Sequence, residues 1–163
     1  NVGSSLVLGG EMEVKYNYAN LLDLTLNGTY TDERDRTRTN IYGKPNPTYG
    51  YRIPNDPFLY GNLLLGANWR KPFGIQASAI HFNAGLGYIH WFYLTWAAFG
   101  RKNTKAVIPT SYDLSAGVTW SFAHDRYSIS LQSSNLLDRP LYDNYMLQKP
   151  GRAFYCKLRI FLN

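Results

Sequence analysis

The sequence contains little of what marks several common classes of protein. Its 163 residues include one cysteine, Cys156, which excludes a disulfide within the chain. No stretch approaches the eighteen or more apolar residues of a membrane-spanning helix. No segment has a convincing amphipathic helical period, which argues against an ordinary soluble α/β domain. What the chain does have is many aromatic residues (16%, with 14 Tyr) and a net charge of +6.

Motifs of catalysis and metal binding are also missing. The sequence contains no glycine-rich phosphate loop, no G-x-S-x-G, no H-x-x-x-H and no C-x-x-C. The three histidines are far apart along the chain, at His81, His90 and His124. Glu11 and Glu13 share a strand face with Lys15, which is the pattern of a solvated wall and not of an acid–base pair. We therefore predict no catalytic residue, no metal site, no cofactor and no enzyme activity.

What is present is a series of segments in which apolar and polar residues alternate. This period of two is the pattern of a strand with one apolar and one polar face. It predicts seven strands, at about residues 6–18, 22–31, 58–69, 75–96, 112–122, 127–134 and 153–163. In the fourth strand the run YIHWFYLTW blurs the alternation, so the sequence predicts a strand there but not which side each residue faces.

The predicted connections alternate between short and long. Three are tight turns, and three are long loops at residues 32–57, 97–109 and 135–150. Short turns on one rim and long loops on the other are typical of outer-membrane barrels, in which strands of about 9–11 residues cross the bilayer at about 45°. Aromatic residues at strand ends fit interfacial girdles: Tyr16, Tyr18, Tyr30, Trp69, Trp120, Phe122 and Tyr127. The alternative is a β-sandwich with these aromatics in its core.

We therefore predict an all-β fold, a transmembrane antiparallel β-barrel segment of about seven strands. The alternation also predicts the facing of individual residues. The residues expected to contact lipid are Leu24, Leu26, Leu114, Val118, Ile129, Leu158 and Ile160. The residues expected to face the lumen include Thr25, Ser115, Ser130, Lys157 and Arg159. For Cys156 we expect a structural role, as a small apolar residue on the lipid side, in preference to a reactive thiol.

The C-terminal segment NLLDRPLYDNYMLQKPGRAFYCKLRIFLN, residues 135–163, is the most specific part of the sequence. Its N-L-x-D turn, Y-D-N-Y, P-G-R and final alternating strand resemble the C-terminus of a TonB-dependent outer-membrane receptor, of the kind common in Bacteroides-like bacteria. The pattern G-x-E-x-E-x-x-Y ending at Tyr16 and the segment from Ile53 to Pro57 are similar to the same family. The chain departs from the family at its end, where Leu162 and Asn163 replace the usual aromatic residue.

The resemblance implies a bacterial outer-membrane protein with a 22-stranded barrel around an internal plug. Seven antiparallel strands cannot close by themselves, because single-chain bacterial barrels use even numbers. Residues 1–163 would then be the C-terminal part of the barrel, with the plug domain and earlier strands absent. The expected partners are the remainder of the barrel and plug, TonB through the missing plug region, and outer-membrane lipid or lipopolysaccharide. The start NVGSSLVLGG lacks the features of a signal peptide, so any secretory signal is expected outside these residues.

The loop at residues 32–57 is the candidate for contact with a small-molecule ligand, because it interleaves basic residues with tyrosines. Arginines recognise carboxylate or phosphate, and tyrosines stack on flat ligands. The candidates are Arg34, Arg36, Arg38, Tyr42, Lys44, Tyr49 and Tyr51, together with Arg52. A siderophore, haem or corrinoid would suit them. The alternative is a solvated loop whose cations balance Asp32, Glu33 and Asp35 or meet lipopolysaccharide phosphates.

Three functions therefore remain open from the sequence. The first is an active-transport receptor fragment, which contributes barrel wall and extracellular loops. The second is a passive porin-like or structural barrel segment, and the third is a soluble β-barrel binding protein. Nucleic acid is not expected as a partner, because the basic residues are scattered over loops and turns and form no single stripe.

Overall fold

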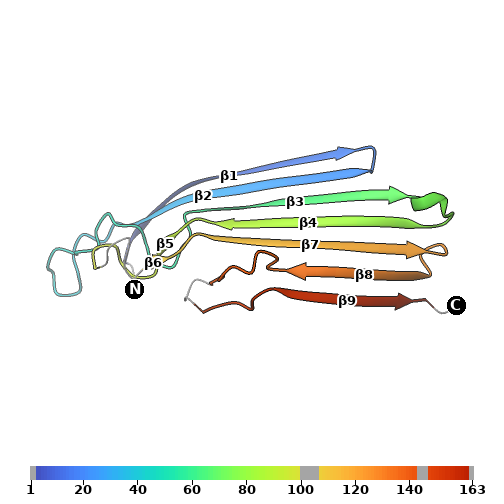
Figure 1. The fold of residues 1–163 in the computed structure, drawn as a ribbon. Coiled ribbons are helices and arrows are strands. Elements are labelled where there is room, and N and C mark those ends of the chain that lie inside the picture. Colours follow the sequence, from blue (N-terminus) through green and yellow to red (C-terminus); the bar gives the residue numbers. More distant parts are fainter. Residues whose placement is uncertain (1–2, 100–106, 143–146, 162–163) are drawn as a thin grey trace.

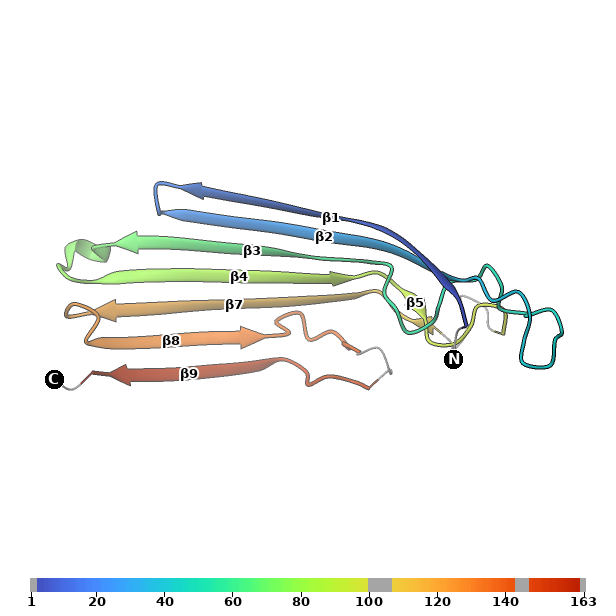
Figure 2. The ribbon, with the colours of Figure 1, turned by 180° about the vertical axis from the view of Figure 1, so that it is seen from behind.

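The computed structural model describes residues 3–99, 107–142 and 147–161. Seven strands form one antiparallel sheet in the order β1-β2-β3-β4-β7-β8-β9 (Figures 1 and 2). They are β1 (Ser5–Tyr18), β2 (Leu22–Asp35), β3 (Leu59–Arg70), β4 (Ala79–Ile89), β7 (Ser111–Phe122), β8 (Tyr127–Ser134) and β9 (Ala153–Ile160). A second, two-stranded sheet pairs β5 (Phe92–Tyr93) with β6 (Val107–Ile108), and η1 (Pro72–Gly74) is a short 3-10 turn. The prediction of an all-β fold with seven antiparallel strands is confirmed.

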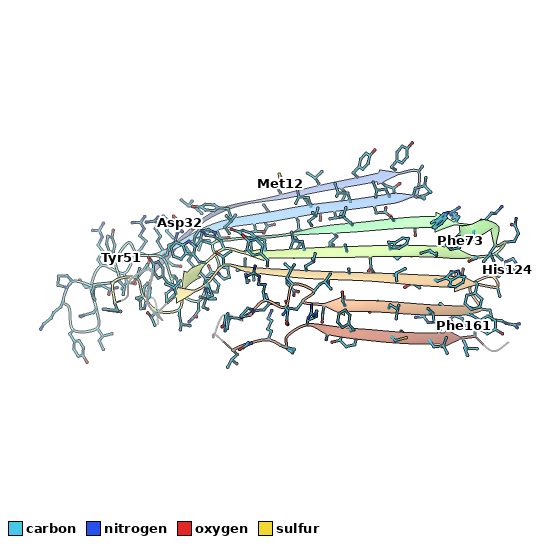
Figure 3. The ribbon with its side chains drawn as sticks, in the orientation of Figure 1. Met12, Asp32, Tyr51, Phe73, His124 and Phe161 are labelled. Carbon is cyan, nitrogen blue, oxygen red and sulfur yellow. The ribbon has the colours of Figure 1, made fainter. Side chains whose placement is uncertain are left out.

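The connections are sorted between the two ends of the sheet. The turn rim carries residues 19–21, 71–78 and 123–126, and the loop rim carries 36–58, 90–110 and 135–152. Figure 3 places Phe73, His124 and Phe161 at the turn rim and Asp32 and Tyr51 toward the loop rim. The tightest turn has positive φ at both Ala19 (50°) and Asn20 (55°), which matches the right-handed twist of the strands that it joins.

The strand register determines which residues share a face, because residues directly opposite each other in an antiparallel pair point to the same side. Following the pairs across the sheet places all the residues predicted to contact lipid on one side, which we call the apolar face: Leu24, Leu26, Leu114, Val118, Ile129, Leu158 and Ile160. The predicted lumen residues lie on the other side, the polar face: Thr25, Ser115, Ser130, Lys157 and Arg159. The register also assigns β4, in which Phe82 and Leu86 point to the apolar face.

Two predicted boundaries were wrong. The predicted strand 75–96 is shorter, because β4 ends at Ile89 and the following residues leave the sheet. Phe92 in β5 and its partner Ile108 are both buried at the loop rim. This burial explains why the run YIHWFYLTW is apolar but does not alternate. The predicted loop 32–57 starts too early, because β2 continues to Asp35, which pairs with Ser5 of β1. Arg34 therefore lies on a strand and not in a loop.

The sheet has a single layer, so its apolar face has no second layer over it. In the described part of the chain the buried apolar side chains are Phe92, Ile108 and Leu141 at the loop rim and Pro72 at the turn rim. In contrast, Leu158 on the apolar face is 62% exposed and Leu131 is 53% exposed. No helix among the described residues is long and apolar enough to cross a membrane.

Some residues used in the sequence analysis lie outside the described ones. They are Leu162 and Asn163 at the end of the chain, residues 143–146 in the predicted loop 135–150, and residues 100–106 in the predicted loop 97–109.

Candidate functional site

The loop rim beside β2 is organised around the carboxylate of Asp32. Its Oδ2 lies 2.7 Å from Nε of Arg34, and its Oδ1 lies 2.6 Å from Nε of Arg52. Arg52 also donates a 3.1 Å hydrogen bond to the Tyr30 hydroxyl, and its guanidinium lies 4.0 Å from the centre of the Phe58 ring. Asp32 binds both arginines, and Arg34 also donates a 3.3 Å hydrogen bond to the Gly50 carbonyl, so residues 50–53 are held against the end of β2. The anion nearest to both arginines is therefore the Asp32 carboxylate of the protein itself.

The neighbouring Asp35 carboxylate fixes the rest of this loop, residues 36–58. Its side chain is 2% exposed and accepts hydrogen bonds from the Thr37 amide (2.7 Å), the Asn46 side chain (2.9 Å) and the Thr48 hydroxyl (2.6 Å). Asp35 lies beyond Tyr30, where pairing between β2 and β3 ends. Burial raises the pKa of the Asp35 carboxyl, but the hydrogen bonds from Thr48, Thr37 and Asn46 outweigh this effect and hold its pKa below the ordinary value.

A second carboxyl in the same loop has the opposite shift. Burial raises the pKa of Asp56, and the negative charge of Glu33 raises it further. The neighbouring residue Asn55 has a positive φ of 59° and donates its amide to the Tyr93 carbonyl at 2.8 Å. This bond joins the loop 36–58 to the segment that follows β4. The two loops therefore form one connected structure at the loop rim.

The predicted ligand-contact residues divide into two groups. Arg34, with Arg52, is held by Asp32 as described above. The others are exposed, and Arg36 lies over the ring of Tyr49 at 5.9 Å. Tyr42, at the far end of the loop near Gly43, is 79% exposed. Within the described residues Arg36, Arg38 and Lys44 make no ion pair, so their charges are available to a ligand. Tyr51 is 44% exposed, and its carbonyl accepts the Asp35 amide at 3.0 Å.

A cavity of about 490 Å³ lies between the loop 36–58 and the segment after β5. Its walls include Thr37, Asn40, Ile41 and Pro47 on one side and Trp96 and Phe99 on the other. None of the predicted basic residues lines it. The sequence analysis missed Trp96 and Phe99, because the apolar run that contains Trp96 suggested a continuous strand. The end of alternation after Ile89 is the signal that could have found them.

Aromatic side chains lie at both ends of the apolar face. At the turn rim the rings of Phe122 and Tyr127 stack at 5.4 Å, and the Trp120 indole donates a 2.7 Å hydrogen bond to Ser78. At the loop rim the rings of Tyr88 and Tyr112 lie 5.3 Å apart. Between these two belts the apolar face carries aliphatic residues, together with Phe82 on β4 and Phe154 on β9.

The histidines are separated in space as well as in sequence. Nδ1 of His81 lies 2.7 Å from the Asn68 side-chain oxygen, and Nδ1 of His90 lies 2.7 Å from the Tyr88 hydroxyl. His124 lies in the turn between β7 and β8. Among the described residues, no group of three or more His, Cys, Asp or Glu side chains is placed to hold a metal ion.

Comparisons with known proteins identify the fold. No family model matches the sequence, and no curated protein is significantly similar to it. The structure of the siderophore receptor PiuA from Acinetobacter baumannii is similar over 94% of this chain, with a TM-score of 0.71 and 20% identity. BauA, the ferric preacinetobactin receptor from the same species, is similar over 94% of this chain, with a TM-score of 0.70 and 12% identity. This chain spans 21% and 22% of their lengths. Its fold is therefore that of a barrel portion of TonB-dependent siderophore receptors.

Proposed function

We propose that this chain forms part of the wall of a transport receptor in the bacterial outer membrane. The observation that carries the proposal is the pair of aromatic belts on the apolar face. Tyr112 and Phe122 lie ten residues apart on β7, which is about 33 Å along a strand. At a tilt of about 35–45° this distance corresponds to roughly 23–27 Å across the bilayer, close to the roughly 25 Å apolar band of outer-membrane barrels. In this arrangement the apolar face contacts lipid and the polar face lines the lumen.

The rest of the barrel is the first partner that this proposal requires. Within the described sheet β1 and β9 each have one neighbouring strand, so each leaves one backbone edge unpaired. Every unpaired backbone group in lipid costs several kcal/mol, by order of magnitude, so a spanning sheet must be closed. We propose that further strands, in a barrel of 22, pair with these two edges. Residues 1–163 are then its C-terminal part, and a plug outside this chain provides the connection to TonB.

The loop rim is the extracellular side in this proposal, and its loops contribute to uptake of a siderophore, haem, corrinoid or similar ligand. The fold is shared with receptors whose names specify a siderophore and ferric preacinetobactin. The exposed residues that would bind anionic groups of the ligand are Arg36, Arg38 and Lys44. The exposed residues whose rings would stack on the ligand are Tyr42, Tyr49 and Tyr51. Arg34 and Arg52 lie on the apolar side of β2 just beyond Tyr30, which suits contact with lipopolysaccharide at the membrane surface.

Uptake by cells tests this function. Cells that produce the intact receptor would be given radiolabelled iron as ferric preacinetobactin or as haem, or radiolabelled cobalamin, with and without an uncoupler of the proton-motive force. We expect uptake of one of these ligands to saturate and to stop when the uncoupler is added. The alternative, a passive porin-like segment, predicts uptake that neither saturates nor responds to the uncoupler.

A further inference from the structure

A second pocket, of about 260 Å³, opens on the polar face near the loop rim of β3, β4 and β7. Tyr60, Asn62 and Asp113 form its floor, and the strand register places all three on the polar face. Leu141, Tyr142 and Lys149, which belong to the described parts of the loop 135–152, cover it from above. The pocket shares no lining residue with the cavity beside Trp96.

The covering loop is held in place by its own hydrogen bonds. The Asn135 side chain is 3% exposed, donates to the carbonyl of Arg139 at 2.9 Å and accepts the Arg139 amide at 3.1 Å. The Lys149 amide donates to the Leu141 carbonyl at 2.8 Å, and the Leu141 side chain is buried. These bonds hold the described residues 135–141 and Lys149 in place without a ligand, which lowers the entropic cost of binding one.

Gly87 keeps the floor of the pocket open. A Cβ atom at this position would lie 3.5 Å from Oδ1 of Asn62 and 3.8 Å from Cβ of Asp113, which are ordinary contact distances. A larger side chain would therefore be tolerated by the backbone and would extend into the pocket. The absence of a side chain at Gly87 thus provides the space on the polar face at this point.

The pocket is lined by opposite charges that do not pair with each other. Within the described residues, neither the Asp113 carboxylate nor the Lys149 ammonium makes an ion pair or a side-chain hydrogen bond. The hydroxyl groups of Tyr60 and Tyr142 have no hydrogen-bond partner there either. Asp113, Lys149 and Tyr60 are exposed, so they are hydrated in the free protein and can exchange this water for a ligand with complementary groups. The volume lies just below the roughly 300–1,000 Å³ usual for drug-sized ligands, so it suits a small molecule or one end of a larger one.

We propose that this pocket binds a zwitterion of amino-acid to dipeptide size, with its ammonium group toward Asp113 and its carboxylate toward Lys149. The tyrosine hydroxyls and Asn62 contribute hydrogen bonds to the centre of the ligand. The proposal rests on the proposed function for its location, because the polar face then lines the lumen below the extracellular mouth. It adds a ligand class that the loop 36–58, with its surplus of cations, does not suit.

The test measures binding to the purified intact receptor by titration calorimetry. The probes are the dipeptide alanyl-alanine, its N-acetylated form, which lacks the ammonium group, and its amide, which lacks the carboxylate. We expect each capped form to bind about fivefold more weakly, the effect of one solvent-accessible ion pair. Asp113→Asn should weaken alanyl-alanine and its amide but not the acetylated form. Lys149→Gln should weaken alanyl-alanine and its acetylated form but not the amide.

Three controls accompany these variants. Asp125→Asn and Lys71→Gln make the same chemical changes at the exposed turn rim and should leave binding unchanged. Gly87→Leu should abolish binding of all three probes by filling the pocket, while the heat-modifiable migration typical of a folded barrel confirms that the receptor still folds. The proposal is overturned if alanyl-alanine does not bind, if the capped forms bind equally well, or if Asp113 and Lys149 cross-link to another segment of the receptor. Ligand uptake that persists in any of these cases leaves the proposed function intact.

Discussion

The Thr48 hydroxyl donates a 2.6 Å hydrogen bond to the buried Asp35 carboxylate, and this contact closes the loop 36–58 onto the end of β2. The two residues are thirteen positions apart, so the bond fixes the path of the chain between them. A loop of this length would otherwise be free to adopt many conformations. The exposed candidates for ligand contact, Arg36, Arg38 and Tyr49, therefore project from a defined scaffold.

The first prediction concerns this bond. Thr48→Val removes the hydroxyl but keeps the shape of the side chain, and we expect local stability of the loop to fall by about 1.5–3 kcal/mol, the usual contribution of a hydrogen bond to a charged group. Limited proteolysis of the receptor on intact cells should then cut within residues 36–58 more rapidly. Thr39→Val is the matched control, because the Thr39 side chain makes no hydrogen bond among the described residues. Equal cutting of both variants would contradict the prediction.

The same carboxylate predicts a dependence on pH. Because the folded-state pKa of Asp35 lies below its ordinary value of 3.8, the stabilisation is complete above about that pH. It is lost as the pH falls through the lower folded-state pKa, when the carboxylate is protonated. Hydrogen exchange of the loop amides should therefore increase on acidification below about pH 4 relative to their intrinsic rates. In Asp35→Asn this increase should be smaller, because the titrating group is absent.

The third prediction concerns the two faces of the sheet. Leu131 and Gln132 are adjacent on β8 but point to opposite faces, and they pair with Val118 and Gly117 midway between the two aromatic belts. If the apolar face contacts lipid, Leu131→Arg near the bilayer midplane should destabilise the barrel by about 2–4 kcal/mol. Gln132→Arg should have a much smaller effect, because the polar face can hydrate the guanidinium. Urea unfolding in lipid vesicles measures both free energies, and similar losses for the two variants would reject the proposed orientation.

The fourth prediction is that the chain does not fold on its own. The backbone edges of β1 and β9 would then remain unpaired in the membrane, at a cost too high for a stable structure. We expect residues 1–163 to be recovered folded from outer membranes only together with the other strands of the barrel, either in the same polypeptide or in a second one. Size-exclusion chromatography and mass spectrometry in detergent would detect the partner. A monodisperse folded preparation of this chain alone would be inconsistent with the barrel proposal.

The strands could be predicted from the sequence because alternation is a local property. In β7 the apolar residues from Leu114 to Phe122 occur at every second position, and the structure keeps them on one face. The ends of β2 and β4 depend instead on distant contacts. Asp35 is held by Thr48, and Phe92 packs with Ile108, which comes sixteen residues later. No local period contains this information.

The sequence also could not predict which basic residues pair with a carboxylate and which remain exposed. The spacing of Arg34, Arg36 and Arg38 suggested three equivalent cations. Only the folding of the loop brings Arg52 to the same carboxylate as Arg34, twenty residues after Asp32. Asp32 thereby removes two cations from the candidate set. The composition gives the number of charges, but which charges pair across a loop depends on the tertiary structure.

The last prediction concerns capture of an anionic ligand by the exposed cations of the loop 36–58. Arg36, Arg38 and Lys44 replaced together by Gln should weaken ligand binding and lower its dependence on salt, because screened pairs at exposed sites contribute about 1 kcal/mol or less each. Tyr51→Ala should weaken binding with little change in salt dependence, because ring stacking is not screened.

Tyr49→Ala should affect both properties, since Arg36 lies over its ring. Arg70→Gln, Lys71→Gln and Arg126→Gln together, at the turn rim, make the same change in net charge and serve as the control. Binding measured from low to high salt separates these effects. If the triple variant binds at wild-type affinity across this range, the loop cations are only solvated, and capture depends on another part of the barrel.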